Sequence, residues 1–329
     1  MPAVDAGVSQ ISWQPVIVLR GILVIWAMCM GVIVAGMTTG YMFPADMIAF
    51  ESNRGVSVFT RIHLLDLRTA IIHPVTPHAQ TSVQPAWSPD GGYLAYQVAP
   101  NQDNTWRVDA FALSAPHTVI ELVRNAIHPA WSPDGRYIAF SRYDGVYSTN
   151  NVHVYDLETR TSTNIAPSRD IAQFLPAWSP YGTQIVISGT SPFNRSLTNI
   201  YTFPFMPQPA EPVTFTTVSR TNTASQPVWL SPGDVLFTSS ITERNESLIR
   251  TPATAHSLDF PVPMPLTFIE YPDVLPDGGR MVFSARDASG TGARSLYIAD
   301  ADGTNIQRLT YPTSNRTIDN VPVWRPRSR

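Results

Sequence analysis

The sequence contains no lysine, so all 22 of its basic residues are arginines. Schiff-base enzymes and nucleotide-binding P-loops each need a lysine amine at a defined position, and both classes are therefore excluded. Charged residues make up only 14% of the 329 residues, and the formal net charge is −3. Because the chain has no strong basic field, we expect no nucleic-acid partner.

Cysteine is almost absent as well, since Cys29 is the only one and lies inside an apolar run. A single thiol excludes an intramolecular disulfide and a cysteine-based zinc cluster. The sequence also lacks the G-x-S-x-G nucleophile elbow and the H-E-x-x-H zinc motif. We therefore predict a non-enzymatic protein with no catalytic residue, no cofactor and no metal site.

Residues 21–43 form a long uncharged run, GILVIWAMCMGVIVAGMTTGYMF. As a helix, this run is long enough to cross about 30 Å of hydrocarbon. Arg20 precedes it, whereas Asp46 and Glu51 follow it, so the positive-inside tendency places residues 1–20 in the cytoplasm. The sequence predicts a single-pass protein of the plasma membrane whose remaining chain is extracytoplasmic, in the periplasm or at the cell surface.

Two features inside this run leave open whether it is cleaved or retained and which helices it contacts. Val34, Ala35 and Gly36 satisfy the small-residue rule for signal cleavage, so a cleaved signal peptide is the alternative to a retained anchor. Gly36 and Gly40 have the G-x-x-x-G spacing that lets a second transmembrane helix approach closely. The first expected partner is therefore the lipid bilayer, and a helix of another membrane protein is a candidate contact.

The rest of the chain is dominated by an internal repeat. Clear copies are PAWSPDGGYLAYQV from Pro85, PAWSPDGRYIAFSR from Pro129 and PAWSPYGTQIVISG from Pro176, with weaker copies from Pro227 and Pro272. Successive anchor positions are 44, 47, 51, 45 and 50 residues apart, a period typical of one four-stranded propeller blade. The anchors are Trp87, Trp131, Trp178, Trp229, Val274 and Trp324.

Each copy predicts a strand that ends at the tryptophan, a tight S-P-D-G turn, and a second strand that returns antiparallel. Proline presets φ in such a turn, glycine accepts a positive φ, and aspartate hydrogen-bonds nearby amides. We assign this framework role to Asp90, Asp134 and Asp277. Further strands are predicted at 93–98 and 137–142 (second), 62–67, 152–157 and 296–303 (third), and 118–122, 212–215 and 307–311 (fourth).

The two ends of the repeat region complete each other. Residues 47–52, MIAFES, match a second strand that lacks its tryptophan strand, whereas Trp324 ends a strand that lacks a successor. Pairing them would close a ring of six blades and remove open sheet edges. The predicted domains are a cytoplasmic segment 1–20, a transmembrane anchor 21–43, a six-bladed propeller 47–324 and a basic tail 325–329.

At these residues the chain resembles the TolB family and its WD40-like repeat, often called PD40 after the P-D dipeptide. The resemblance covers about 47–324. It implies an all-β fold, a six-bladed TolB-like β-propeller, here preceded by one N-terminal transmembrane helix. It does not cover the small α/β domain that precedes the propeller in TolB. The family's role in protein recognition implies that another membrane or extracytoplasmic protein is the partner, with this chain as an accessory or scaffold subunit of a membrane complex.

His63 and His153 share the context His-x-x-Asp, which would suit metal ligation. In other copies the equivalent position is Tyr201 or Tyr297. Because tyrosine and histidine share an aromatic ring here, we interpret the position as an aromatic framework site of the repeat.

The basic tail contains Arg325, Arg327 and Arg329. Only residues 43–46 separate the apolar run from the first strand, a connection of about 14 Å at full extension. We therefore expect the closing blade at the membrane surface, with the three arginines near lipid headgroups or a partner's transmembrane helices. A solvated, frayed tail is the alternative.

Two rival functions are an enzyme acting on a small molecule or glycan at the channel mouth, and a sensory domain for small ligands.

Overall fold

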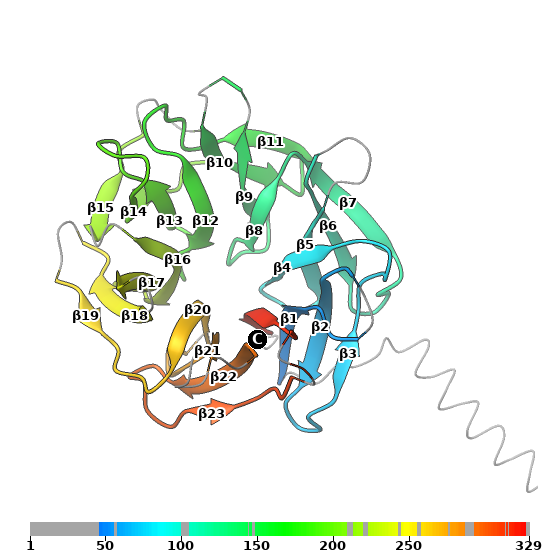
Figure 1. The fold of residues 1–329 in the computed structure, drawn as a ribbon. Coiled ribbons are helices and arrows are strands. Elements are labelled where there is room, and N and C mark those ends of the chain that lie inside the picture. Colours follow the sequence, from blue (N-terminus) through cyan, green and yellow to red (C-terminus); the bar gives the residue numbers. More distant parts are fainter. Residues whose placement is uncertain are drawn as a thin grey trace, which may run out of the picture. The chain divides into compact units, whose positions relative to one another are not determined.

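The structure is a computed structural model that describes most of the chain from residue 46 onward. Within the described residues, the strands form six four-stranded antiparallel sheets, which are arranged as blades around one axis (Figure 1). This confirms the predicted six-bladed β-propeller. The described residues are 46–55, 58–99, 105–143, 145–146, 149–208, 213–219, 223–242, 245–254, 258–275, 277–286, 293–312, 314 and 316–326.

Several sequence-based predictions lie outside the described residues. Among the residues that the structure does describe, no helix is long and apolar enough to cross a membrane. The transmembrane anchor and its contacts therefore remain predictions. The positions concerned are the segment 1–20, the apolar run 21–43 with Gly36 and Gly40, and the tail residues Arg327 and Arg329.

The innermost strand of every blade is the one that ends at, or close to, a repeat anchor. These strands surround the axis of the ring (Figure 1). They are β4 (Ser82–Trp87), β8 (Ile127–Trp131), β12 (Gln173–Trp178), β16 (Ala224–Ser231), β20 (Thr267–Val274) and β24 (Asp319–Trp324).

The second strand of each blade carries much of the hydrophobic core. These strands are β1 (Met47–Ser52), β5 (Tyr93–Val98), β9 (Tyr137–Tyr143), β13 (Gln184–Thr190), β17 (Asp234–Thr242) and β21 (Arg280–Arg286). In β1, β5, β13 and β21, four or five consecutive side chains are buried. Phe50, Phe140, Phe237 and Phe283 are fully buried. The continuous apolar pattern arises because neighbouring blades cover both faces of these strands.

The third and fourth strands complete each blade away from the axis, and exposure increases outward. In β19 and β23, both residues of the strand are exposed. The third strands are β2 (Arg61–Asp66), β6 (Arg107–Ala112), β10 (Asn150–Asp156), β14 (Thr198–Pro204), β18 (Asn245–Pro252) and β22 (Ser295–Asp300). The fourth strands are β3 (Ile72–Pro74), β7 (Val119–Arg124), β11 (Thr161–Asn164), β15 (Thr216–Ser219), β19 (Phe260–Pro261) and β23 (Gln307–Arg308).

One predicted fourth strand is displaced along the chain. The sequence placed it at 212–215, whereas β15 begins at Thr216 and pairs Thr217 with Tyr201 of β14. Prolines at 207, 209 and 212 cannot donate to a sheet ladder, so pairing starts only after them. The fourth strands predicted at 118–122 and 307–311 are present as β7 and the shorter β23.

β24 and β1 come from opposite ends of the repeat region and pair antiparallel in one blade. Ile48 lies opposite Trp324, and beyond a bulge Ser52 lies opposite Asp319. The backbone amide of Arg325 also donates to the Met47 carbonyl oxygen at 2.9 Å. The pairing is the one that the two incomplete repeat ends predicted, and it ties the chain ends together through backbone hydrogen bonds.

Every innermost strand also contains a bulge at its X-Pro pair. A residue before proline disfavours the helical regions, and a positive φ is uncommon outside glycine. In this ring the residue before the innermost-strand proline has a positive φ in every blade, between +47° and +56°. Its recurrence at the same position shows that packing around the axis overrides the local preference. The six residues are Gln84, His128, Leu175, Gln226, Tyr271 and Val321.

Candidate functional site

The six X-Pro pairs line a central channel with a volume of about 320 Å³. Proline has no N–H group, so six prolines give the channel wall a rigid backbone with few donors. Among the described residues that line the channel, Asp273 is the only acid. The prolines are Pro85, Pro129, Pro176, Pro227, Pro272 and Pro322.

Asp273 interrupts the repeat at a position where the other copies have alanine or valine. Its Oδ2 accepts a hydrogen bond from the Trp324 backbone amide at 2.6 Å, which connects β20 to β24. Desolvation raises the pKa of Asp273 to about 6. The carboxyl group is therefore poised to change charge just below neutral pH, inside the channel.

A second titratable group, Glu51, lies near the end of β1 and contacts Gln84 in the channel wall. Part of its side chain remains accessible, but desolvation by the surrounding strands raises its pKa to about 7. Glu51 Oε2 accepts the backbone amide of Gln84 at 3.1 Å, and its side chain also bonds to Asn320. Nearby, Arg294 Nη2 donates to Glu270 Oε1 at 2.8 Å, so this acid already has a cationic partner.

Raised carboxyl pKa values are common at functional sites. Here, however, Asp273 and Glu51 each accept a backbone amide from a different innermost strand. Both acids therefore have a clear structural use in joining blades. What the two acids offer chemically is proton uptake near neutral pH, by Asp273 in the channel wall and by Glu51 beside the channel-lining residue Gln84.

The histidines with the His-x-x-Asp context occupy the expected framework position. His63 stacks on Phe50 of the neighbouring strand at 5.6 Å between ring centroids, and His153 stacks on Phe140 at 5.7 Å. Tyr297 makes the equivalent contact in another blade. Across the part of the chain that the structure describes, no group of three or more histidine, cysteine, aspartate or glutamate side chains could hold a metal ion.

The aspartates of the S-P-D-G turns hold these turns together. Ser88 Oγ donates to Asp90 Oδ1 at 2.5 Å, and the same oxygen accepts the Gly92 amide at 2.9 Å. The bond from Ser88 is the main reason that the pKa of Asp90 is lowered. Asp134 accepts the equivalent bonds in the next blade, and Asp277 accepts one amide. All three side chains are engaged within their own turns.

The repeat tryptophans connect adjacent blades. The indole Nε1 of Trp87 donates to the Val323 carbonyl, that of Trp178 to the Ala130 carbonyl and that of Trp229 to the Ala177 carbonyl, at 3.1–3.2 Å. Trp131 differs, because its buried Nε1 has no acceptor among the described residues. At the closing blade, the Arg280 guanidinium lies over the Trp324 ring, 5.6 Å from its centroid.

Arg325, the described member of the basic tail, contacts the neighbouring blade. Its Nε donates to the Gly91 carbonyl oxygen at 3.0 Å, and its guanidinium lies over the Trp87 ring, 5.7 Å from the centroid. Gly91 has a positive φ of 66°, and an added Cβ would lie 2.7 Å from the Pro326 carbonyl oxygen. Arg325 therefore helps to join the closing blade to the next one, a use that the sequence did not reveal.

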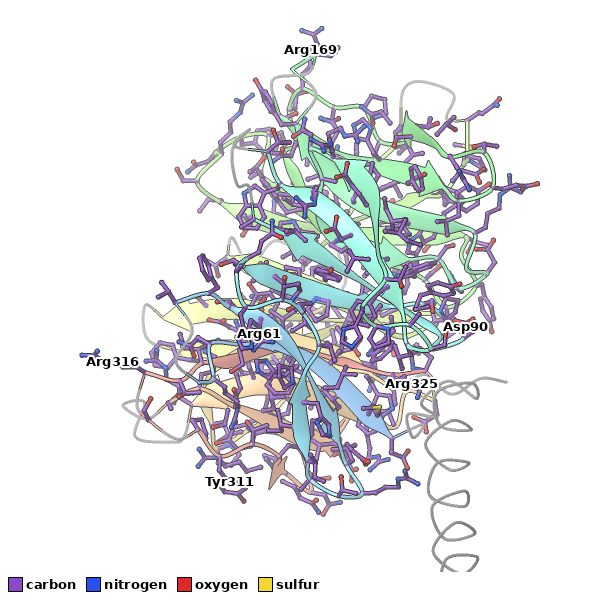
Figure 2. All side chains as sticks on the ribbon, turned by 90° about the vertical axis from the view of Figure 1, so that its right-hand side faces the viewer. Arg61, Asp90, Arg169, Tyr311, Arg316 and Arg325 are labelled. Atoms are coloured by element: carbon purple, nitrogen blue, oxygen red, sulfur yellow. The ribbon has the colours of Figure 1, made fainter. Side chains whose placement is uncertain are left out.

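The ring has two distinct faces, seen edge-on in Figure 2. The turn face carries the turns between first and second strands, and Asp90 and Arg325 mark it. The loop face carries the connections between second and third strands, and Arg61 and Arg316 mark it. Because β1 starts at Met47, next to Arg325, the N-terminal end of the propeller is on the turn face.

The connection from β1 to β2 and the connection from β23 into β24 expose four apolar side chains, which we call the closing-blade patch. The exposed fractions are 94% for Val58, 69% for Tyr311, 48% for Ile318 and 39% for Phe59. Single exposed apolar residues are ordinary. We take these four together as a candidate interaction surface because hydrogen bonds join the two connections that carry them. The sequence offered little signal, since Val58 and Phe59 lie in a predicted loop and Tyr311 lies in the fourth strand predicted at 307–311, which ends at Arg308 as β23.

Hydrogen bonds hold the two loops of this patch together. The side chain of Asn53 accepts the Ile318 amide at 2.8 Å and donates to the Arg316 carbonyl oxygen at 3.0 Å. The Arg54 guanidinium binds both carboxylate oxygens of Asp319, whose side chain is fully buried. The patch is therefore built on a fixed platform at the junction of the N-terminal and C-terminal strands.

Comparisons with known proteins identify the architecture. No protein-family model and no curated protein matches this sequence. TolB from Acinetobacter baumannii is similar in structure, with a TM-score of 0.69 and 17% identity over 90% of this chain and 70% of that one. A putative TolB from Agrobacterium tumefaciens gives 0.60 and 16% over 84% and 98%, and the tricorn protease gives 0.55 and 11% over 85% and 31%. The chain therefore has the fold of the TolB-like six-bladed propellers.

Proposed function

We propose that this chain is a non-catalytic, membrane-anchored propeller that binds another protein through its loop face. The observation that carries the proposal is the closing-blade patch, formed by Val58, Phe59, Tyr311 and Ile318. Burial of such side chains against a partner is favourable by about 25 cal/mol per Å² of apolar surface. A platform that is already ordered loses little conformational entropy on binding, which favours recognition.

The likeness to TolB supports protein recognition as the role, although it establishes only the fold. The partner that fits best is a membrane or extracytoplasmic protein. This chain would then be an accessory or scaffold subunit of a membrane complex, with no cofactor of its own.

The proposed anchor is consistent with the choice of the loop face. If 21–43 spans the plasma membrane, only residues 43–46 connect it to β1, about 14 Å at full extension. β1 begins on the turn face, so that face would lie near the lipid and the loop face would point away from it. The tail arginines Arg327 and Arg329 would follow Arg325 on the membrane side and meet phosphates or acidic partner groups there.

Purification from the native membrane in mild detergent tests the partner. The wild-type chain should retain a stoichiometric companion, and the double variant Val58→Ser/Tyr311→Ser should lose most of it at an unchanged melting temperature. The matched control is Tyr181→Ser, which removes a side chain exposed by 76% from a tight turn on the opposite face. Equal retention by both variants would exclude the closing-blade patch, and a lone wild-type chain would contradict the subunit role.

A separate experiment tests the anchor. The intact mass of the mature protein should include residues from near Met1, and protease on the extracytoplasmic side should digest the propeller. A mature N-terminus near Met37 would identify 21–43 as part of a cleaved signal and would exclude the anchor. If Arg327 and Arg329 contact headgroups, replacing both with serine should weaken membrane attachment more at low salt than at high salt, because salt already screens the attraction in the wild type.

The rival function, an enzyme at the channel mouth, is favoured by one specific observation. Asp273 and Glu51 have pKa values near 6 and 7, the range in which a carboxyl group exchanges protons at physiological pH. We rank it second because each acid accepts a backbone amide that joins two blades. Activity on a glycan or small molecule that is lost in both Asp273→Asn and Glu51→Gln, with the fold intact, would reverse the ranking.

A further inference from the structure

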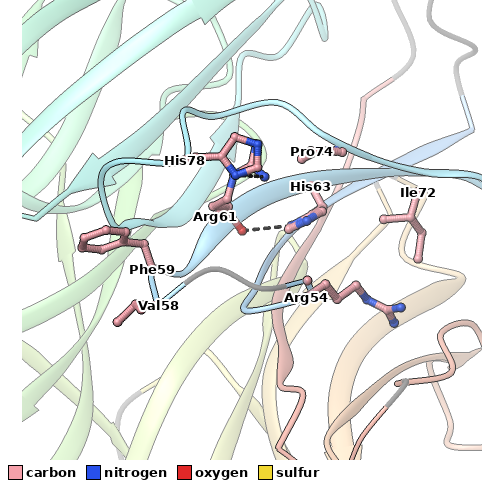
Figure 3. A pocket seen from close by; sticks show the side chains of 9 residues that line it. Arg54, Val58, Phe59, Arg61, His63, Ile72, Pro74 and His78 are labelled. Carbon is pink, nitrogen blue, oxygen red and sulfur yellow. Dashed lines mark hydrogen bonds between the residues drawn. The ribbon is translucent and has the colours of Figure 1, made fainter.

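A pocket at the beginning of β2 shares Val58 and Phe59 with the closing-blade patch (Figure 3). Its volume is about 710 Å³. Four nitrogen-rich side chains line it, from Arg54, Arg61, His63 and His78, and the rest of the wall is largely apolar. This combination of a cationic end and an apolar wall is not explained by the packing of the propeller.

Arg61 is the unusual member of this pocket. Only 7% of the residue is exposed, yet no carboxylate pairs with it among the described residues. Its Nε and Nη2 donate to the Thr76 carbonyl oxygen at 2.9 and 2.6 Å, and Nη1 donates to His78 Nδ1 at 3.1 Å. A guanidinium has five N–H donors, so two remain on its terminal nitrogens. A buried charge without a counter-charge is costly, and an anion would relieve that cost.

Arg54, in the same pocket, has the carboxylate partner that Arg61 lacks. Its Nε donates to Asp319 Oδ1 at 2.8 Å, and Nη2 pairs with the other oxygen of this carboxylate. Ser52 Oγ also donates to Asp319, at 2.7 Å. Asp319 is thus fully engaged by β1 and the following loop, and it leaves Arg61 uncompensated.

The two imidazoles present complementary groups to the same space. A guanidinium can only donate, so His78 Nδ1 is an acceptor and the ring proton lies on Nε2. The Arg61 carbonyl oxygen can only accept, so His63 Nδ1 carries the proton in the 3.2 Å contact between them. His78 is exposed and offers an N–H donor, whereas burial lowers the pKa of His63 to about 4, so its Nε2 remains an acceptor at neutral pH.

We propose that this pocket binds a small organic anion, a carboxylate or phosphate group on an apolar body, and that Arg61 anchors the anionic group. The planar guanidinium matches both oxyanions and binds them through charge-assisted hydrogen bonds. Phe59, Ile72 and Pro74 would contact the apolar body of the ligand. The site goes beyond the proposed partner surface, because it is an open hollow that would take a small molecule, although Val58 and Phe59 belong to both.

The experiment uses the full-length protein in detergent micelles and titrates three probes by calorimetry at constant ionic strength, with chloride as the balancing ion. The probes are inorganic phosphate, phenyl phosphate and benzoate. We expect saturable binding of phenyl phosphate or benzoate, and the tighter of the two identifies a phosphate or a carboxylate as the preferred group. Inorganic phosphate should bind more weakly because it lacks the apolar body.

Arg61→Met should weaken binding at least tenfold, since it removes the charged donors but keeps an apolar stem. The matched control is Arg68→Met, which removes the same charge from an exposed turn, where Arg68 pairs with Asp66. If Arg61→Met fails to fold, a crystal structure of the wild type with phenyl phosphate decides, because the anion must lie within hydrogen-bond distance of Arg61. Absence of saturable binding for all three probes, undiminished binding by Arg61→Met, or an anion located elsewhere would overturn the proposal.

Discussion

Two junctions between blades solve the same packing problem with different chemistry. Between β12 and β16, the Trp229 indole donates to the Ala177 carbonyl at 3.1 Å, within an apolar cluster that includes Phe237 and Ile249. Between β20 and β24, the residue before the anchor of β20 is Asp273, where the other copies have alanine or valine. There the Asp273 carboxylate accepts the Trp324 backbone amide.

The difference shows which junction between blades can change its charge with pH. An indole N–H and a carbonyl keep the same charge at any physiological pH, whereas a carboxyl group does not. Glu51, Glu270 and Arg294 add further charges to the closing region. The departure from the repeat therefore concentrates titratable groups near the place where the chain ends meet, and the following predictions probe that contrast.

The largest effect is expected from removing the strand that closes the ring. Deletion of 321–329 leaves backbone donors and acceptors of β1 without their partners. It also removes the Trp324 side chain, which is only 7% exposed. A large core truncation alone costs about 3–5 kcal/mol. We expect the cooperative unfolding transition to be lost or strongly shifted in thermal denaturation.

The matched control for this deletion removes only 327–329 and leaves β24 and Arg325 in place. This shorter truncation should keep the melting temperature within a few degrees of the wild type. If both truncations melt alike, the pairing of β1 with β24 contributes little to stability, and the closing blade is not the weak point of the ring.

The next effect concerns the buried ion pair of the closing blade. Asp319→Asn leaves Arg54 without its counter-charge, and breaking a buried pair in this way costs about 3–5 kcal/mol. The double variant Arg54→Met/Asp319→Asn should recover part of that loss because no unpaired charge remains. Urea denaturation of the two single variants and the double variant gives the coupling energy, and a coupling near zero would contradict the role of the pair.

Stability should also depend on pH through Glu51. Its folded-state pKa is about 7, above its ordinary value of 4.5, so between these values the folded protein holds more protons than the unfolded chain. The free energy of unfolding should therefore fall as the pH rises through this window, by up to about 3 kcal/mol, and should be unaffected by Glu51 above it.

The variant Glu51→Gln isolates this contribution. It keeps an oxygen acceptor for the Gln84 amide but cannot ionise. We expect it to be more stable than the wild type at pH 8 and to lose the pH dependence between 6 and 7 in urea denaturation, where only Glu51 of the two acids still titrates. A slope between pH 4 and 6 should persist, because desolvation raises the pKa of Asp273 to about 6 from 3.8. An unchanged profile in Glu51→Gln would assign the sensitivity to another group.

Much of the blade structure could be predicted from the sequence, because each copy of the repeat has the same strand and turn pattern. The position of Trp87, the role of Asp90 in its turn and the pairing of β1 with β24 all follow from aligning the copies. The sites where the copies differ carry no such information. Glu51 looked like a charge flanking the apolar run, but the fold places it against Gln84 and Asn320.

Local rules also fail where the whole ring dictates the backbone. The positive φ of Gln84 and its counterparts contradicts the ordinary preference of a residue before proline. The cationic pocket was equally hidden, because Arg61 and His78 are 17 residues apart and meet only when the loop after β3 folds back. Neither feature has a sequence pattern that could have revealed it.

The smallest expected effect separates two tryptophans that the sequence treats as equivalent. Trp87→Phe removes the indole bond to the Val323 carbonyl and leaves that acceptor unpaired, whereas Trp131→Phe removes an N–H that has no acceptor among the described residues. Both variants lose similar ring volume, so the difference between them should approach the value of one hydrogen bond, about 1 kcal/mol, with Trp87→Phe the less stable. Trp178→Phe serves as the control and should match Trp87→Phe, because its indole makes the equivalent bond to Ala130. Urea midpoints measure the three variants side by side. If Trp131→Phe lowers the free energy of unfolding as much as the other two variants, packing alone accounts for the stabilisation by the anchor tryptophans. The indole hydrogen bonds would then add no measurable stability to the junctions between blades.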